Sequence, residues 1–347
     1  MGKKLFDYVI GNPPYQDETL GDNKGFAPPV YDKFLNSAFE TADAVEMIHP
    51  ARFLFNAGST PKAWNEKMLS DPHFKVLYFE QNSSKVFPNT DIKGGVAITY
   101  YDARKDYGEI GVFTAFSELN TLLKKTISTA GFTPLSTIIV SSYAYHFTDE
   151  LHTDYPSIKD KMSKGHQFDL KTNVLEKLTE IFTIEQPLDG HEYIQILGRV
   201  DGKRTYRFVR RDYITKVKNL DKYKVFLAKA NGSGALGEVM STPLIGEPLI
   251  GSTESFLSIG SFETLQEAEA TEKYVKSKFA RCLLGVLKTT QDITPDKWKY
   301  VPLQDFTKNS DIDWSKSIHE IDLQLYRKYG LDENEIEFIE THVKEMA

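Results

Sequence analysis

A run of four residues near the amino terminus, Asn12-Pro13-Pro14-Tyr15, has the residue types needed for chemistry on a planar amine. An amine attached to an aromatic ring shares its lone pair with the ring, so the lone pair must be localised before the nitrogen can attack. Hydrogen bonds from the amine to the side-chain oxygen of Asn12 and to a backbone carbonyl would favour the required pyramidal geometry. The two prolines stiffen the loop and remove backbone donors. Tyr15 offers a flat face for stacking a base, worth about 1–3 kcal/mol.

The elements around this loop must hold it at the edge of a sheet. Phe6 to Ile10 is a short apolar run that predicts a strand directly before Asn12, and ligands of open α/β sheets lie beyond the carboxyl ends of strands. Strands and helices alternate in the first hundred residues, which predicts a mostly parallel sheet covered on both faces. The further elements expected are strands at 44–48, 75–80 and 95–101 and helices at 30–41 and 61–69. The alternative is that the four residues form only a rigid turn.

The run from Phe6 to Tyr15 resembles the catalytic motif of the amino-methyltransferases, and more narrowly of the Eco57I-type adenine-N6 DNA methyltransferases of restriction-modification systems. Val30 to Phe34 resembles the next helix of that family, which helps to wall the cofactor and base pocket. Ile48 to Leu54 is similar to the following motif, and Lys85 to Val96 resembles the motif whose phenylalanine packs against the target adenine, which makes Phe87 the matching position.

The resemblance implies a site-specific enzyme that methylates adenine N6 in double-stranded DNA from S-adenosylmethionine. Because a base inside a duplex cannot reach such a pocket, the target adenine would be extruded from the helix. The catalytic residues would be Asn12, Pro13, Pro14 and Tyr15, with Tyr15 and Phe87 stacking on the base. Asn12 and Tyr31 would also contact the cofactor.

The usual cofactor-binding motif of this family is not found in the sequence. In the family a glycine-rich turn and an acidic residue lie well upstream of the catalytic loop, and here only eleven residues precede Asn12. The run Gly232 to Gly237 has the spacing of a dinucleotide-binding turn, but Pro243, Gly246 and Pro248 follow it and argue against the helix that such a turn requires. We therefore expect the chain to bind S-adenosylmethionine poorly alone, and a second polypeptide to supply the cofactor-binding half or a nuclease.

The fold class expected is α/β, with a partial Rossmann-like methyltransferase sheet followed by a mixed α+β target-recognition domain. The expected domains are a catalytic half (1–130), a connecting helical segment (131–185), a recognition domain (186–310) and a carboxyl-terminal helical appendage (311–347). Helices are expected at 118–128, 170–182 and 263–284, a β-rich segment at 192–258, and two short helices in 315–346 split at Gly330.

A strongly basic segment is the first candidate for DNA contact. Between Arg199 and Lys229 there are eleven basic residues against three acidic ones, a net charge of +8, and aromatic residues lie among them. A solvated charged surface is the alternative. The candidates in this segment are Arg199, Lys203, Arg204, Arg207, Arg210 and Arg211. The stretch from Lys224 to Thr294 resembles the recognition domain of the same family, and it adds Lys229, Asn231, Lys288 and Gln291 as possible readers of base edges or phosphates.

Composition excludes several other classes. The chain of 347 residues carries a net charge of −7, which disfavours an indiscriminate nucleic-acid binder. The single cysteine, Cys282, excludes an internal disulfide and a cysteine-based zinc site. No apolar run approaches eighteen residues and no signal peptide is visible, so a cytoplasmic protein without a membrane partner is expected. No metal site is expected either, because the eight histidines are scattered, and no set of carboxylates suits a nuclease.

Two other functions stay open at this level. The chain could be a recognition subunit with a methyltransferase-like fold and no chemistry of its own. It could also be a protein glutamine-N5 methyltransferase, because the amide nitrogen has similar geometry, although the +8 segment favours DNA.

Overall fold

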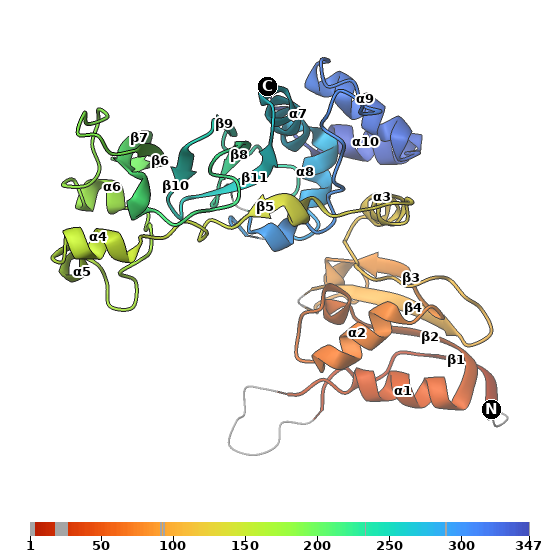
Figure 1. Cartoon of the computed structure of the whole chain (residues 1–347). Helices are drawn as coiled ribbons and strands as arrows, with labels where there is room; N and C mark the ends of the chain where they lie inside the picture. Colours follow the sequence, from red (N-terminus) through yellow and green to blue (C-terminus); the bar gives the residue numbers. More distant parts are fainter. Residues whose placement is uncertain are drawn as a thin grey trace. The chain divides into compact units, whose positions relative to one another are not determined.

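The structure is a computed structural model, and it describes residues 4–17, 27–90, 92, 94–232, 234–288 and 290–346. The chain divides into two compact units, Met1–Asn120 and Thr121–Ala347, which are described separately here (Figure 1). No helix among the described residues is both long enough and apolar enough to cross a membrane.

Unit 1 is built on a four-stranded sheet with the order β1-β2-β4-β3. β1 pairs in parallel with β2, in a register that joins Phe6 to Ala42 and Gly11 to Met47. β4 runs antiparallel to both β2 and β3. The elements of this unit are β1 (Phe6–Gly11), α1 (Tyr31–Thr41), β2 (Ala42–Pro50), η1 (Arg52–Phe55), α2 (Lys62–Ser70), β3 (Phe74–Glu80), η2 (Ser83–Lys85) and β4 (Val96–Asp102).

The expected strands and helices of unit 1 are present, but the expectation of a mostly parallel sheet is wrong. Parallel neighbours need a long crossover, and α1 provides one between β1 and β2. No α-helix occurs among the described residues between β3 and β4, so the chain returns antiparallel and β4 enters between β2 and β3.

Helices α1 and α2 lie side by side in unit 1, where the indole Nε1 of Trp64 donates to Asn36 Oδ1 at 3.0 Å. Their apolar residues join the sheet in one core. Its buried members include Tyr31 and Leu35 of α1, Trp64 and Met68 of α2, and Phe74 of β3. This packing fixes the carboxyl end of β1 relative to the start of α1, which is where the candidate loop lies.

Unit 2 holds two sheets. One has the order β10-β6-β7 and the other the order β5-β11-β8-β9. Helix α3 spans the boundary between the units. The elements from that boundary onward are α3 (Ser117–Ile127), η3 (Leu135–Ile138), β5 (Ile139–Val140), α4 (Asp149–Asp154), α5 (Ile158–Lys161), α6 (Val174–Lys177), β6 (Tyr193–Val200), β7 (Lys203–Arg210), η4 (Arg211–Tyr213), β8 (Tyr223–Ala228), β9 (Leu244–Gly246), β10 (Ile250–Ser252), β11 (Phe256–Phe262), α7 (Leu265–Lys276), α8 (Lys278–Leu284), η5 (Pro295–Trp298), α9 (Ile318–Lys328) and α10 (Glu333–His342).

Two expected helices of unit 2 differ in the structure. The stretch 170–182 contains only the four-residue α6, although its apolar residues, Leu170, Val174 and Leu178 among them, are buried in one core. The expected helix 263–284 is divided at Ser277, whose hydroxyl accepts a hydrogen bond from the Ala280 amide and so caps α8. The two carboxyl-terminal helices and their division at Gly330 are confirmed, and Cys282 is buried and free.

The core of unit 2 crosses one of the boundaries expected from sequence. Buried residues from 145–182, such as Phe147 and Leu175, pack in one cluster with Ile194 and Ile196 of β6 and Val209 of β7. In the structure the segment 145–182 therefore forms a common core with the start of the basic β-rich region.

Candidate active site and DNA-contact residues

The Asn12 loop begins where β1 ends at Gly11. Asn12 and Pro14 are exposed, Pro13 is buried and Tyr15 is half-buried. The loop is therefore anchored by Pro13 while the amide of Asn12 faces outward at the carboxyl end of the strand. This is the placement that the sequence predicts for a reactive loop.

The residues that follow the loop are tied to the start of α1. The amide of Val30 donates to the Tyr15 carbonyl at 3.2 Å, and the amide of Asp17 donates to the Pro28 carbonyl at 2.9 Å. Gln16 and Pro29 form an antiparallel bridge. These contacts hold Tyr15 next to the first turn of the helix.

Phe87 is held by a compact turn between β3 and β4. Its amide donates to the Ser83 carbonyl at 2.8 Å, and the Thr90 hydroxyl donates to the Phe87 carbonyl at 2.6 Å. The buried Ser83 hydroxyl donates to the Thr90 carbonyl and accepts from the Ile92 amide. The turn ends at Gly95, whose φ of 78° and close approach to the Glu80 carbonyl leave no room for a Cβ atom.

The structure brings Tyr15 and Phe87 together although 72 residues separate them in the chain. Their ring centroids lie 6.4 Å apart with an interplanar angle of 65°, an edge-to-face contact. The hydroxyl of Tyr15 is buried and has no hydrogen-bond partner among the described residues, and burial raises its pKa. Beside the exposed Asn12 there is thus an aromatic pair with one unpartnered polar atom.

Tyr31, expected to contact the cofactor, is a core residue. Its ring stacks on His49, with centroids 5.7 Å apart and an interplanar angle of 3°. The His49 Nε2 lies 2.7 Å from the Thr99 hydroxyl, and burial lowers the pKa of His49 to about 4. Burial also raises the pKa of Tyr31 to about 12. The Tyr31 ring is therefore part of the core of unit 1.

The adjacent Asp32 was not singled out from the sequence. Its carboxylate is buried, and in the part of the chain that the structure describes its Oδ1 atom has no hydrogen-bond partner. Because an acidic residue in the first turn of a helix is common on surfaces, no sequence pattern marks this one.

The glycine run near 232–237 has a structural role. Ser233 lies outside the described residues. The amide of Gly234 donates to the Glu238 carboxylate at 2.9 Å, and a Cβ atom at Gly232 would overlap the same carboxylate. Gly237 lies against the backbone of His342 and Val343. The described residues after it form turns and irregular chain up to β9, so no helix follows the run.

Four of the residues expected to contact DNA are bonded within unit 2. Arg210 pairs with Asp154 and Asp212, and Arg211 pairs with Asp221. The other two are buried: Asn231 bonds the Ala228 carbonyl and the Ser241 amide, and Lys288 forms an ion pair with Glu238. The sequence could not reveal these partners, because most of them lie far along the chain.

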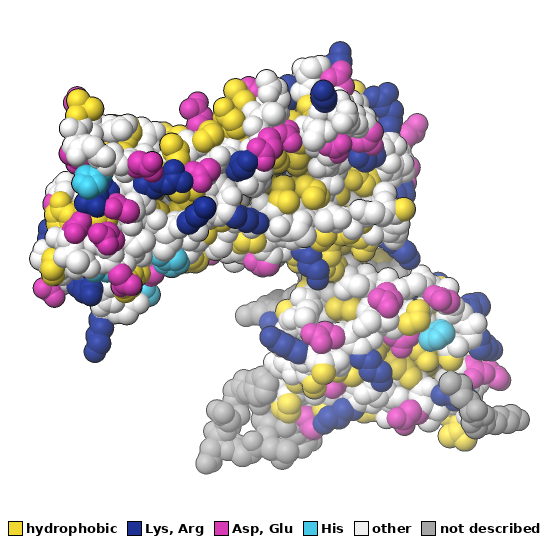
Figure 2. All heavy atoms as spheres, in the orientation of Figure 1, with side chains coloured by type: hydrophobic (Ala, Val, Ile, Leu, Met, Phe, Trp, Pro, Cys, Tyr) yellow, Lys and Arg dark blue, Asp and Glu magenta, His cyan; other side chains and the backbone are white. Residues whose placement is uncertain are grey.

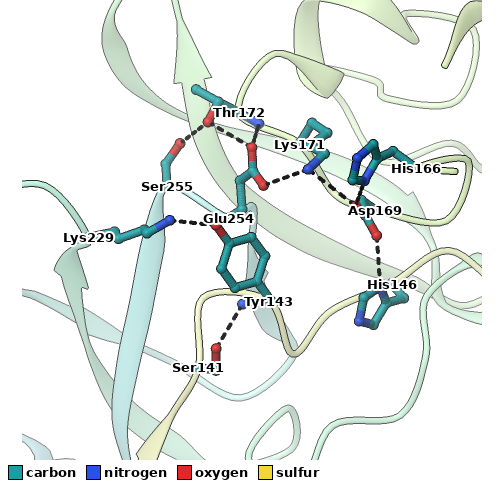
Figure 3. Close-up of polar contacts among 10 residues, drawn as sticks. All are labelled: Ser141, Tyr143, His146, His166, Asp169, Lys171, Thr172, Lys229, Glu254 and Ser255. Carbon is teal, nitrogen blue, oxygen red and sulfur yellow. Dashed lines mark hydrogen bonds and ion pairs between the residues drawn. The ribbon is translucent and has the colours of Figure 1, made fainter. Parts of the chain in front are cut away.

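Lys229 lies in a polar cluster that links several loops of unit 2 (Figure 3). Its Nζ atom donates to the Tyr143 hydroxyl at 2.6 Å, and Tyr143 is about half exposed. In the same cluster, Asp169 lies between His166, 2.7 Å away, and His146, 3.5 Å away. Tyr143 and the two histidines were missed from the sequence, which has no pattern that relates them to Lys229.

The remaining candidates lie at the surface. Gln291 is exposed, and its carbonyl accepts from the Asn231 amide. The other four, Arg199, Lys203, Arg204 and Arg207, lie on the β6–β7 hairpin and form no ion pair among the described residues. On the face drawn in Figure 2, Lys and Arg side chains gather in the region of β6, β7 and β10.

Comparison with known proteins gives matches in the amino-terminal part of the chain. Residues 1–87 match the family model of the Eco57I restriction-modification methylase. An uncharacterized adenine-specific methylase of Mycoplasma pneumoniae is 28% identical over 120 residues, which cover 34% of this chain and 28% of that protein.

Several solved structures are also similar to this chain. The type IIG restriction endonuclease BpuSI has a TM-score of 0.35 and 12% identity, covering 97% of this chain and 53% of that one. The type IIL restriction-modification enzyme MmeI in complex with DNA has a TM-score of 0.33 and 10% identity, covering 96% and 56%. The chain thus spans less than two thirds of the length of each of these relatives. Over residues 1–87, which run from the strand before Asn12 to Phe87, the chain matches the Eco57I restriction-modification methylases.

Proposed function

We propose that unit 1 is the catalytic half of a DNA adenine-N6 methyltransferase of a restriction-modification system, and that unit 2 recognises the DNA. The observation that carries this proposal is the contact between Tyr15 and Phe87 beside the exposed Asn12. The matches to methylases over the amino-terminal part of the chain support it.

The residues of the loop would act on an adenine extruded from the duplex. The Asn12 oxygen and a carbonyl of the proline pair accept hydrogen bonds from the exocyclic amine, which localises its lone pair. Tyr15 and Phe87 hold the base by stacking, which offsets the few kcal/mol that extrusion costs. The prolines keep the acceptors in place without competing donors.

The residues present do not fit the whole of S-adenosylmethionine. Its polar ends need a glycine-rich turn between a strand and a helix, and the glycine run of this chain is filled by the Glu238 carboxylate. The ring of Tyr31 packs in the core. We infer that another polypeptide segment supplies most of the cofactor contacts.

The experiment is calorimetric titration of S-adenosylmethionine into the full chain, alone and with a polypeptide that carries a glycine-rich cofactor-binding turn, followed by an assay for N6-methyladenine in duplex DNA. We expect little binding by the chain alone, and both binding and methylation by the pair. Cofactor binding without methylation of any DNA would favour the recognition-subunit alternative. Methylation of a glutamine-containing protein in place of DNA would favour the glutamine-N5 alternative.

A further inference from the structure

The β6–β7 hairpin is a regular two-stranded ribbon. Its strands pair without a register shift from Tyr193 opposite Arg210 to Val200 opposite Lys203. Asp201 and Gly202 connect them, both with positive φ, 50° and 72°. Paired positive φ values are typical of a type I′ turn, whose twist matches that of the strands. The end of the ribbon is therefore geometrically fixed, and so are the side chains beside the turn.

Two arginines lie directly opposite each other next to this turn. Arg199 of β6 is the register partner of Arg204 of β7. Directly opposite residues share one face of the ribbon with Cβ atoms about 4.5–5.5 Å apart, and like charges there are destabilising. Both side chains are half-buried. Burial, and next the charge of Arg199, lower the pKa of the Arg204 guanidinium.

No carboxylate offsets this repulsion among the described residues. Arg199 donates only to the neutral Gly202 carbonyl, at 3.2 Å, and its guanidinium lies 5.9 Å from the Phe256 ring centroid. The nearby Glu176 accepts a hydrogen bond from the Asp201 amide. The charge of Glu247 helps to raise the pKa of Tyr206, and Glu247 forms no ion pair within 4 Å in the described part of the chain. Elsewhere in the basic segment Arg210, Arg211 and Lys222 each have a carboxylate partner.

We propose that Arg199 and Arg204 together form a binding site for a DNA backbone phosphate. Two guanidinium groups on one face can donate to the same phosphate oxygens, and the bound anion removes their mutual repulsion. The inference deepens the proposed function, on whose DNA-binding role it rests. A two-stranded ribbon also has the width to approach the major groove.

The test uses the full chain, a short fluorescent DNA duplex and anisotropy measured over a range of salt concentrations. The variant is Arg199→Gln/Arg204→Gln. The control is Lys222→Gln, which removes a cation from the same segment that Glu263 already neutralises. Because each phosphate contact contributes about −0.9 to the slope of log affinity against log salt, and the two arginines share one phosphate, the double variant should make the slope shallower by roughly one. Its affinity should fall about tenfold, equally for all DNA sequences.

A second readout separates binding from folding. Since the arginines repel each other in the free protein, either single substitution should raise the midpoint of thermal unfolding without DNA, while it weakens DNA binding. The inference is overturned if the wild-type chain binds with a steep slope and the double variant keeps that slope. It is also overturned if the variant loses affinity for one sequence alone, which would indicate contact with base edges. A flat salt dependence of the wild-type chain would instead overturn the DNA-binding role of unit 2.

Discussion

At the scale of single residues, the Tyr15 hydroxyl indicates whether Tyr15 serves the stability of unit 1 or the binding of a ligand. It is buried and no described residue bonds to it, and an unpaired buried polar group costs roughly 1–3 kcal/mol. The ring that carries this hydroxyl contacts the ring of Phe87, and the exposed Asn12 lies three residues earlier in the chain. An atom that is unsatisfied in the free protein is explained most simply by a ligand that satisfies it.

We therefore expect Tyr15→Phe to stabilise unit 1 by about 1 kcal/mol, because it removes an unpaired hydroxyl and retains the ring. The matched control is Tyr8→Phe, which removes a hydroxyl that donates to Glu46 at 2.6 Å and should lower stability. Denaturant unfolding of both variants measures the difference. A loss of stability in Tyr15→Phe as large as in the control would show that the Tyr15 hydroxyl has a partner in the free protein.

At the scale of elements, β1 is an edge strand with unusual exposure. It pairs only with β2 in the described sheet, and Phe6 and Ile10 are 57% and 72% exposed. A strand in a parallel pairing is normally covered on both faces, and an exposed apolar edge invites a further strand. The edge next to the Asn12 loop is thus suited to receive the segment that we propose supplies the cofactor contacts.

We predict that Ile10→Lys abolishes association with the polypeptide that we propose supplies the cofactor contacts, while the chain stays folded, because a substitution at so exposed a position changes stability by only about 0.5 kcal/mol. The control is Leu77→Lys, which changes a 48% exposed leucine on β3 at the other edge of the sheet. Sedimentation equilibrium of each mixture measures association. Equal association by both variants and the wild type would exclude the β1 edge as the interface.

The buried His49 of β2, which packs against α1, predicts that the stability of unit 1 depends on pH. Burial lowers the pKa of His49 from 6.5 to about 4, so the unfolded chain binds more protons between these values. The stabilisation is fully present above pH 6.5 and is lost as the pH falls toward 4. The shift corresponds to a loss of roughly 3 kcal/mol in the free energy of unfolding as the pH falls. In His49→Gln this acid-induced loss should be absent. Hydrogen exchange of the β2 and β4 amides at pH 7 and pH 4.5 measures the stability of unit 1 in the wild-type chain and in His49→Gln. An equal loss of stability at pH 4.5 in the two proteins would show that His49 is not its cause.

The elements of unit 1 were largely predictable from sequence, and their pairing was not. Apolar runs and helical spacing identified the strand before Asn12 and the helix after Val30. β4 enters between β2 and β3, and this order depends on the absence of a helix in the connection, which periodicity does not encode. In the same way, Leu170, Val174 and Leu178 have helical spacing because they share a core, although the chain between them is mostly not helical.

For the candidate site, the motif resemblance identified the pair Tyr15 and Phe87, and the structure places them in contact. The surface of unit 2 was less predictable. Charge density alone could not distinguish Arg199 and Arg204, which have no acidic partner in the described residues, from Arg210 and Lys288, which do. Those partners come from distant parts of the chain, so only the fold separates free cations from neutralised ones.

At the scale of the whole molecule, we propose a different function for each of the two units. Unit 1 carries the loop for the chemistry on the base, and unit 2 carries the cations that would contact phosphates. The net charge of −7 opposes attraction to DNA overall, so binding must depend on a local group of unneutralised cations. A change in the loop should therefore affect methylation without affecting DNA affinity.

The most direct measurement compares the wild-type chain with Asn12→Ala, each with the polypeptide that completes cofactor binding, for both methylation of adenine N6 and affinity for duplex DNA. We predict that Asn12→Ala abolishes methylation, because the amine loses its acceptor, and that DNA affinity stays nearly unchanged, because the phosphate contacts lie in unit 2. An equal loss of methylation and DNA affinity, or full methylation by the variant, would contradict the proposed role of Asn12.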